Sequence, residues 1–193
     1  MPDISRVMAD SRTRFEAIWD THFEAVLGYA RRRAERADAD EATSQTFLIA
    51  WRRLDDIPPG AELPWLLGTC RRVLANTRRS ERRGIALRRR IETEPSASVS
   101  DPGNDVPERM AMVAAFRSLN ATDRETLALI AWDGLTPTEA ATTVGCSPAR
   151  FRARLFRARR RLDSAFALAD HTAASRPVPP DAHTTEPVKE DTR

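Results

Sequence analysis

The chain has 193 residues, a formal net charge of +3 and a pI near 9.5. This length allows one domain or two small ones. With only 7 glycines, 6% aromatic residues and no alternating run rich in Val, Ile and Thr, the composition favours an all-α protein over one with a β-sheet. No stretch approaches the ~20 apolar residues of a membrane span and no apolar leader is visible, so we expect a cytoplasmic protein.

The residues that usually carry catalysis or bind metals are scattered. Cys70 and Cys146 stand alone at apolar positions, and the histidines at 22, 171 and 183 lie far apart in the sequence. No paired carboxylates and no Ser–His or Cys–His set occur at a workable spacing. We therefore expect no metal, no cofactor and no enzymatic activity.

The first part of the chain is predicted to form a helical domain over residues 12–90, after a flexible N-terminus over 1–11. Apolar residues at helical spacing predict a first helix over 12–36 and a second from Asp38, which would cap it with Glu41 at the third position. Residues 55–63 contain Pro58-Pro59-Gly60 and are predicted to be a loop. A third helix begins near Pro64, and nine arginines against one acidic residue follow between 71 and 90.

The second part is predicted to be a separate helical domain over residues 108–168. Residues 91–107 are rich in Glu, Ser, Pro, Asp and Gly, which indicates a flexible linker, and residues 169–193 are predicted to be a disordered tail. One helix is expected over 108–119, and a capping box at 122–125 is expected to open the next. Trp19, Trp51 and Trp132 fall on apolar stripes and are predicted to pack in the core.

Residues 135–162 predict a helix-turn-helix. Thr136 is a plausible N-cap, Pro137 suits the first helical position and Glu139 completes a capping box. Gly145 provides the backbone freedom for a sharp turn, and Ser147 followed by Pro148 repeats the start signal.

The second helix of this motif carries an apolar stripe beside an arginine stripe. Phe151, Leu155, Ala158 and Leu162 predict its buried face. Seven arginines and no acidic residue lie between Ser147 and Leu162, whereas a solvated face normally mixes charges of both signs. A helix of this kind in a helix-turn-helix indicates DNA binding, in the groove and on the phosphates.

Three stretches carry a resemblance to a known family. The run from Asp38 to Trp51 (DADEATSQTFLIAW) resembles the signature helix of bacterial sigma factors of the extracytoplasmic-function (ECF) group. Pro64 to Asn76 resembles the next helix of that family, and Ser147 to Leu162 resembles its promoter-reading helix. The order and spacing of the three stretches extend the resemblance over residues 12–168.

The resemblance implies a protein that binds core RNA polymerase, recognises promoter DNA and directs transcription initiation without covalent chemistry. Residues 12–90 would be a region 2-like domain and residues 108–168 a region 4-like domain, and an anti-sigma factor is a further partner that the family allows. The polymerase-binding residues would be Asp38, Asp40, Glu41, Ser44, Gln45 and Ile49. The −10 element would be contacted by Asp55, Asp56, Glu62, Arg71, Arg72, Asn76, Arg78 and Arg79, and the −35 element by Ser147, Arg150, Phe151, Arg152, Arg154 and Arg157.

The sequence departs from the family pattern at four of these positions. Ser44 and Gln45 stand where Gln and Glu are usual, and Arg150 and Phe151 replace the usual Thr and Val. The resemblance implies that the loop over 55–63 captures an unstacked base of the −10 element. This loop has no aromatic residue on which such a base could stack, so a plain connector between two helices is an equal alternative for it. The alternative function is a stand-alone helix-turn-helix regulator with an N-terminal interaction domain.

Overall fold

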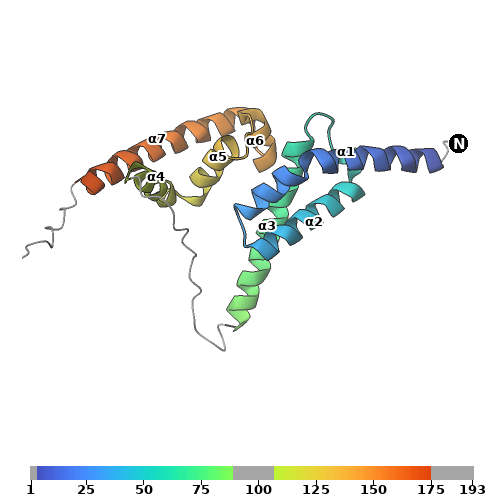
Figure 1. Ribbon diagram of the computed structural model, residues 1–193, viewed down its shortest axis with the longest axis horizontal. Coiled ribbons are helices and arrows are strands. Elements are labelled where there is room, and N and C mark those ends of the chain that lie inside the picture. The colour runs from blue at the N-terminus through green and yellow to red at the C-terminus, as the bar shows by residue number, and fades with distance from the viewer. Residues whose placement is uncertain (1–3, 89–106, 175–193) are drawn as a thin grey trace, which may run out of the picture.

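The computed structural model describes residues 4–88 and 107–174, and every regular element in these ranges is a helix (Figure 1). The N-terminal half comprises α1 (Ile4–Arg31), α2 (Arg36–Arg52), the short 3₁₀ helix η1 (Leu54–Asp56) and α3 (Glu62–Arg88). The C-terminal half comprises α4 (Pro107–Ser118), α5 (Ala121–Ala131), α6 (Pro137–Val144) and α7 (Pro148–Ala174). The all-α prediction is confirmed. Most of the predicted linker and the tail beyond residue 174 lie outside the described residues.

The three long helices of the N-terminal half pack against one another around a shared apolar core. Val26 and Tyr29 of α1, Phe47 of α2 and Leu66 and Leu67 of α3 are all buried there. With the other buried positions of their helices, such as 43, 46 and 50 on α2 and 70, 73 and 74 on α3, these residues form stripes with spacings of three and four, so each helix presents one stripe to the other two. The spacing in the sequence predicted this arrangement.

Aromatic rings cluster where α1 crosses α2. Trp19 stacks on Phe23 at 4.7 Å and contacts Phe47 at 4.6 Å, while Phe15 meets Trp51 edge to face at 5.2 Å. The indoles nevertheless lie at the rim: Trp19 is 37% exposed and Trp51 is 38% exposed. Our prediction that the tryptophans pack in the core was therefore only half right, because helical periodicity marks the edge of a stripe as strongly as its centre.

Several helices begin earlier than the sequence predicted, α1, α2 and α5 among them. α1 starts at Ile4 where we expected flexible residues up to 11, since nothing from Ile4 onward interrupts a helix and Thr13 donates to the Ala9 carbonyl at 3.0 Å. α2 starts at Arg36 after Glu35, which places Asp38 in the first turn, where its charge favours the helix dipole without capping. α5 is capped by Asn120, whose side-chain oxygen accepts from the Asp123 amide at 2.9 Å, and not by the predicted box at 122–125.

In the C-terminal half, α7 is the helix on which the others assemble. It packs against α4, α5 and α6, and its buried side chains are Phe151, Leu155 and Ala158. Trp132, just after α5, is 56% exposed, and its ring centroid lies 4.8 Å from that of Phe116 of α4, so it too lies at the rim.

None of the helices in the described ranges combines the length and apolarity needed to cross a membrane.

Candidate nucleic-acid interface

The helix-turn-helix is formed by α6 and α7, and its local structure follows the predicted signals. Thr136 caps α6, with the Glu139 amide donating to the Thr136 hydroxyl oxygen at 3.3 Å and the Thr136 amide donating to the Glu139 carboxylate at 2.7 Å. Gly145 ends the helix at φ 72°, in the left-handed region that glycine adopts at little cost. The Ser147 hydroxyl then accepts from the Arg150 amide at 3.3 Å and caps α7. The prediction of this motif is confirmed.

The solvent side of α7 is a row of arginines. Arg150, Arg152 and Arg157 are exposed and Arg154 is half-buried. Within the described part of the chain, no carboxylate forms an ion pair with any of these four guanidinium groups. Their donors are therefore available to an external anion, and Arg is the side chain best shaped to fork onto phosphate or guanine.

Phe151 is a correction to the predicted set of DNA contacts. Its side chain is 0% exposed, because it lies on the apolar stripe that α7 turns toward α5 and α6. A side chain in this position supports the angle of α7 and has no access to a base. Departure from the usual Val at this position therefore concerns packing, not the reading of DNA.

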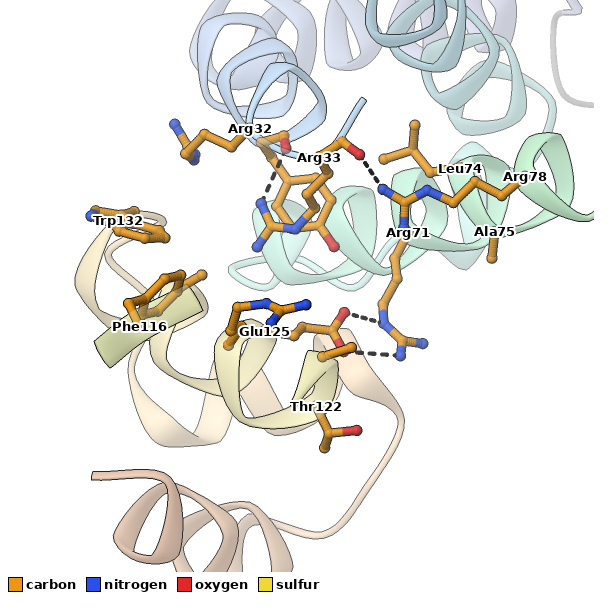
Figure 2. A pocket seen from close by; sticks show the side chains of 14 residues that line it. Arg32, Arg33, Arg71, Leu74, Ala75, Arg78, Phe116, Thr122, Glu125 and Trp132 are labelled. Atoms are coloured by element: carbon orange, nitrogen blue, oxygen red, sulfur yellow. Dashed lines mark hydrogen bonds and ion pairs between the residues drawn. The ribbon is translucent and has the colours of Figure 1, made fainter. Parts of the chain in front are cut away.

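The arginines of α3 lie on two different faces. Arg72, Asn76 and Arg79 recur at intervals of four and three and are exposed. Arg71 is instead directed toward Glu125 of the C-terminal half, and Arg78 toward the end of α1 (Figure 2). Arg71 forms a two-point ion pair with Glu125, with Nε–Oε1 at 2.6 Å and Nη2–Oε2 at 3.2 Å. Arg78 donates to the backbone carbonyl of Arg33. The residues of the predicted −10 set that lie on α3 are thus not brought onto one face of it.

The segment between α2 and α3 is more ordered than a plain loop. Asp55 and Asp56 lie in η1 and are exposed, and Asp56 pairs with Arg53 at 2.8 Å. Ile57 is buried, and its carbonyl accepts a hydrogen bond from Arg14 at 2.6 Å. Glu62, predicted to lie in the loop, is the first residue of α3. This anchoring to α1 holds the segment that carries the two exposed aspartates.

The predicted polymerase-binding residues lie on the outer side of α2. Asp40, Glu41, Ser44 and Gln45 are exposed, and Asp38 and Ile49 are half-buried. Local hydrogen bonds hold this surface, as Gln45 donates to the Glu41 carboxylate at 2.7 Å and Ser44 to the Asp40 carbonyl at 3.0 Å. Sequence reasoning missed Leu48, which is 48% exposed and lies one helical turn after Ser44 and Gln45 on the same surface. The sequence could have indicated Leu48, because it is an apolar residue that lies outside the apolar stripe formed by Phe47 and Ala50.

Sequence reasoning also missed a cluster at the end of α1. Arg32 and Arg33 both form ion pairs with Asp133 of the C-terminal half. The distance from Arg33 Nη2 to Asp133 Oδ2 is 2.7 Å. The Arg33 guanidinium lies 3.6 Å from the centre of the Tyr29 ring. The run of three arginines at 31–33 was the available signal, but their partner is distant in the sequence.

Comparison with known proteins agrees with this architecture. Residues 109–162 match the family described as sigma-70, region 4. The RNA polymerase sigma factor NccH of Alcaligenes xylosoxydans xylosoxydans is 29% identical over 137 residues, covering 65% of this chain and 72% of that protein. The probable RNA polymerase sigma factor RfaY of Xanthomonas campestris pv. campestris is 30% identical over 130 residues, which cover 64% of this chain but 32% of that protein.

Solved structures show the same fold. The sigma factor RpoE from Bartonella quintana, crystallised with the anti-sigma factor NepR, matches 80% of this chain and 97% of its own with a TM-score of 0.60 and 22% identity. CnrH, in complex with the cytosolic domain of CnrY, matches 80% of this chain and 88% of its own with a TM-score of 0.53 and 24% identity. With the region 4 match and the sigma-factor relatives, the all-α fold and its arginine-faced helix-turn-helix make the chain similar to the bacterial RNA polymerase sigma factors of the extracytoplasmic-function group.

Proposed function

We propose that this chain is a sigma factor that binds core RNA polymerase and reads two promoter elements, the −10 element with its N-terminal half and the −35 element with its C-terminal half. The observation that carries the proposal is the solvent side of α7, where Arg150, Arg152, Arg154 and Arg157 follow a capped turn without a carboxylate partner among the described residues. A row of arginines without partners favours a polyanion as ligand.

The −35 element would be read from the start of α7. Arg150 and Arg152 lie in its first turns, which is the part of a recognition helix that reaches base edges. Arg154 and Arg157 lie further along the helix and would contact phosphates. Bidentate contacts from Arg to guanine are the expected base contacts.

The −10 element would be contacted by the exposed face of α3 and by the segment before it. Asn76 is the residue of that face best suited to read adenine, while Arg72 and Arg79 suit phosphates. Asp55 and Asp56 are exposed near the start of α3 and have the polar groups with which an unstacked base could be held. Arg71 belongs to the same proposed set, although its guanidinium is paired with Glu125.

Core RNA polymerase would dock on the outer side of α2, with Leu48 as the apolar centre and Asp40, Glu41, Ser44 and Gln45 around it. An exposed apolar residue inside a polar rim is the usual arrangement of a protein interface. An anti-sigma factor is a further proposed partner, supported by the shared fold with RpoE and CnrH, both of which are solved in complexes.

The test is co-elution of the purified chain with bacterial core RNA polymerase on gel filtration. The variant Asp40→Arg/Gln45→Arg should lose co-elution, since both side chains are exposed on α2. Asp20→Arg/Thr21→Arg changes the charge by the same amount at exposed positions of α1 and should retain it. A folded protein that never binds polymerase would instead indicate a stand-alone regulator.

A further inference from the structure

A cavity lies where α1 and α3 face α5 (Figure 2). Its volume of about 520 Å³ falls within the range of small-molecule sites, which is roughly 300–1,000 Å³. Among the residues that line it, Glu125 carries the one carboxylate, whereas five carry guanidinium groups: Arg32, Arg33, Arg71, Arg78 and Arg124. The lining is therefore strongly cationic.

Two of these arginines keep a charge that no described carboxylate neutralises. The other three are in the ion pairs given above, but Arg78 and Arg124 donate to backbone carbonyls and form no ion pair with a described residue. Arg78 comes from α3 and Arg124 from α5, so each half of the chain supplies one. Ala121 and Thr122, in the first turn of α5, also line the cavity and add the positive end of a helix dipole. Such a lining favours a ligand with several anionic oxygens, as in a di- or triphosphate.

Tyr29 adds a hydrogen-bond donor without a partner. Its side chain lines the cavity and is 0% exposed, and its hydroxyl makes no hydrogen bond to any described residue. Burial raises the pKa of this hydroxyl above its ordinary 10, so it keeps its proton at neutral pH. A buried donor without an acceptor is unfavourable, and a ligand oxygen that reaches it would remove that cost. The hydroxyl is thus a second indication of an oxygen-bearing ligand, independent of the arginines.

One side of the cavity is aromatic. Figure 2 shows Phe116 and Trp132 together on this side, and Arg71 and Arg78 on the other. The two ring centroids are 4.8 Å apart with 66° between the planes, and Trp132 is 56% exposed. An indole that is open to solvent offers a face on which a planar base stacks. A ligand with a base at one end and phosphates at the other matches both sides.

We propose that this cavity binds a nucleoside di- or triphosphate, with the base on Trp132 and the phosphates between Arg78 and Arg124. The Tyr29 hydroxyl donates to an oxygen of the ligand. The inference goes beyond the proposed function and does not depend on it, because neither the α2 surface nor α7 takes part. Arg78 also belongs to the proposed −10 set, so the tests measure nucleotide binding and not promoter binding.

Isothermal titration calorimetry of the full chain tests the class of ligand. GTP and ATP should each bind in a ratio of one per chain, because stacking on an indole does not select between bases. Guanosine and inorganic triphosphate carry the two parts of the ligand separately, and each should bind at least about tenfold more weakly than GTP. Triphosphate that binds as tightly as GTP would overturn the nucleoside part of the proposal. Absence of GTP binding by the folded chain up to about 1 mM would overturn the site.

Substitutions on both sides of the cavity test where the ligand lies. Trp132→Ala and Arg78→Ala, both at exposed positions, should each weaken GTP binding at least about fivefold. Arg52→Ala removes the same charge at the exposed end of α2, outside the cavity lining, and should bind GTP like the wild type. Circular dichroism confirms that each variant is folded. Equal weakening by Arg78→Ala and Arg52→Ala would mean that GTP responds to the net charge of the chain, which contradicts the proposal.

Conservative variants separate contact with the ligand from support of the fold. Trp132→Phe keeps a ring on which a base can stack and should retain GTP binding within about threefold. Tyr29→Phe removes the hydroxyl alone and should weaken GTP binding about fivefold, without a loss of stability in urea, because that hydroxyl has no described partner. Unchanged GTP binding by Tyr29→Phe would overturn the hydroxyl as a donor. Equal losses in Trp132→Phe and Trp132→Ala would overturn stacking on this side chain.

Discussion

Arg161 of α7 and Asp123 of α5 form an ion pair, with Nη1 2.6 Å from Oδ2, that fastens the recognition helix to the helix that precedes the helix-turn-helix. The Asp123 side chain is 4% exposed and also accepts from the Asn120 side-chain nitrogen at 2.7 Å. Arg161 is one of the seven arginines of the α7 run, and it is held internally. Its role is therefore to fix α7 on its support, unlike the arginines that precede it.

Replacing Asp123 should destabilise the C-terminal half. Asp123→Ala removes the ion pair and the Asn120 hydrogen bond, and we expect a loss of about 1–3 kcal/mol because Arg161 can turn to water and leaves no buried charge behind. Urea unfolding followed by circular dichroism measures it. Asp163→Asn, at an exposed position of α7, should change stability by less than about 0.5 kcal/mol. Equal effects of the two variants would contradict this role of Asp123.

The capping box of α6 should make stability depend on pH. Hydrogen bonds from the Thr136 hydroxyl and amide lower the pKa of Glu139 below its ordinary 4.5. Because the pKa is lower in the folded state, the stabilisation by Glu139 is present above pH 4.5 and is lost as the pH falls through the folded pKa. Glu139→Gln should thus be less stable than wild type at pH 7, by up to about 1 kcal/mol, with the difference shrinking in acid. A difference independent of pH would rule out this explanation.

The arginines on the solvent side of α7 should contribute to the salt dependence of DNA binding. Arg157→Ala should reduce the slope of log K against log salt by about 0.9, the value for one lost phosphate contact on duplex DNA. Arg12→Ala is the control, since Arg12 is paired with Glu16 on α1. Fluorescence polarisation over a salt series measures both slopes. A wild-type slope in Arg157→Ala would mean that this side chain does not touch phosphate.

Gly68 should be needed for the contact between α3 and α6. Gly to Ala inside a helix normally stabilises by up to about 1 kcal/mol, but at Gly68 the new Cβ would press on the Thr143 backbone. We expect Gly68→Ala to lower the free energy of unfolding by about 1 kcal/mol. Gly28→Ala, where a Cβ meets only the far end of the Arg32 side chain and no backbone, should be neutral or stabilising. Stabilisation by both variants would show that the two helices adjust without cost.

Leu48 should matter for polymerase binding and not for folding. Leu48→Glu should weaken binding to core RNA polymerase at least about tenfold, because a charge would replace the apolar centre of the α2 surface. Met8→Glu provides the control at another exposed apolar residue. Biolayer interferometry with immobilised core enzyme measures both affinities. Equal loss in the two variants would indicate a general effect of added negative charge.

Local signals explain how much of the site could be predicted. Thr136, Glu139, Gly145 and Ser147 act on residues within four positions of themselves, so the sequence predicted the turn and both helix starts. The start of α5 was harder to predict, because Asn120 and Thr122 are both residue types that suit an N-cap. In the structure the Asn120 side chain accepts from the Asp123 amide and caps the helix. Phe151 was assigned to DNA by analogy, although its own periodicity had already placed it in the core.

The sequence by itself determined the helices, their apolar stripes and the excess of arginine on α3 and α7, because these depend on the spacing of neighbouring residues. Only the tertiary structure decided which arginines are available. Arg71 and Arg161 resemble the other arginines of their helices in sequence, yet each is paired with a carboxylate, Glu125 and Asp123 respectively. Such pairing depends on how α5 lies against α3 and α7, and helical periodicity contains no information on that arrangement.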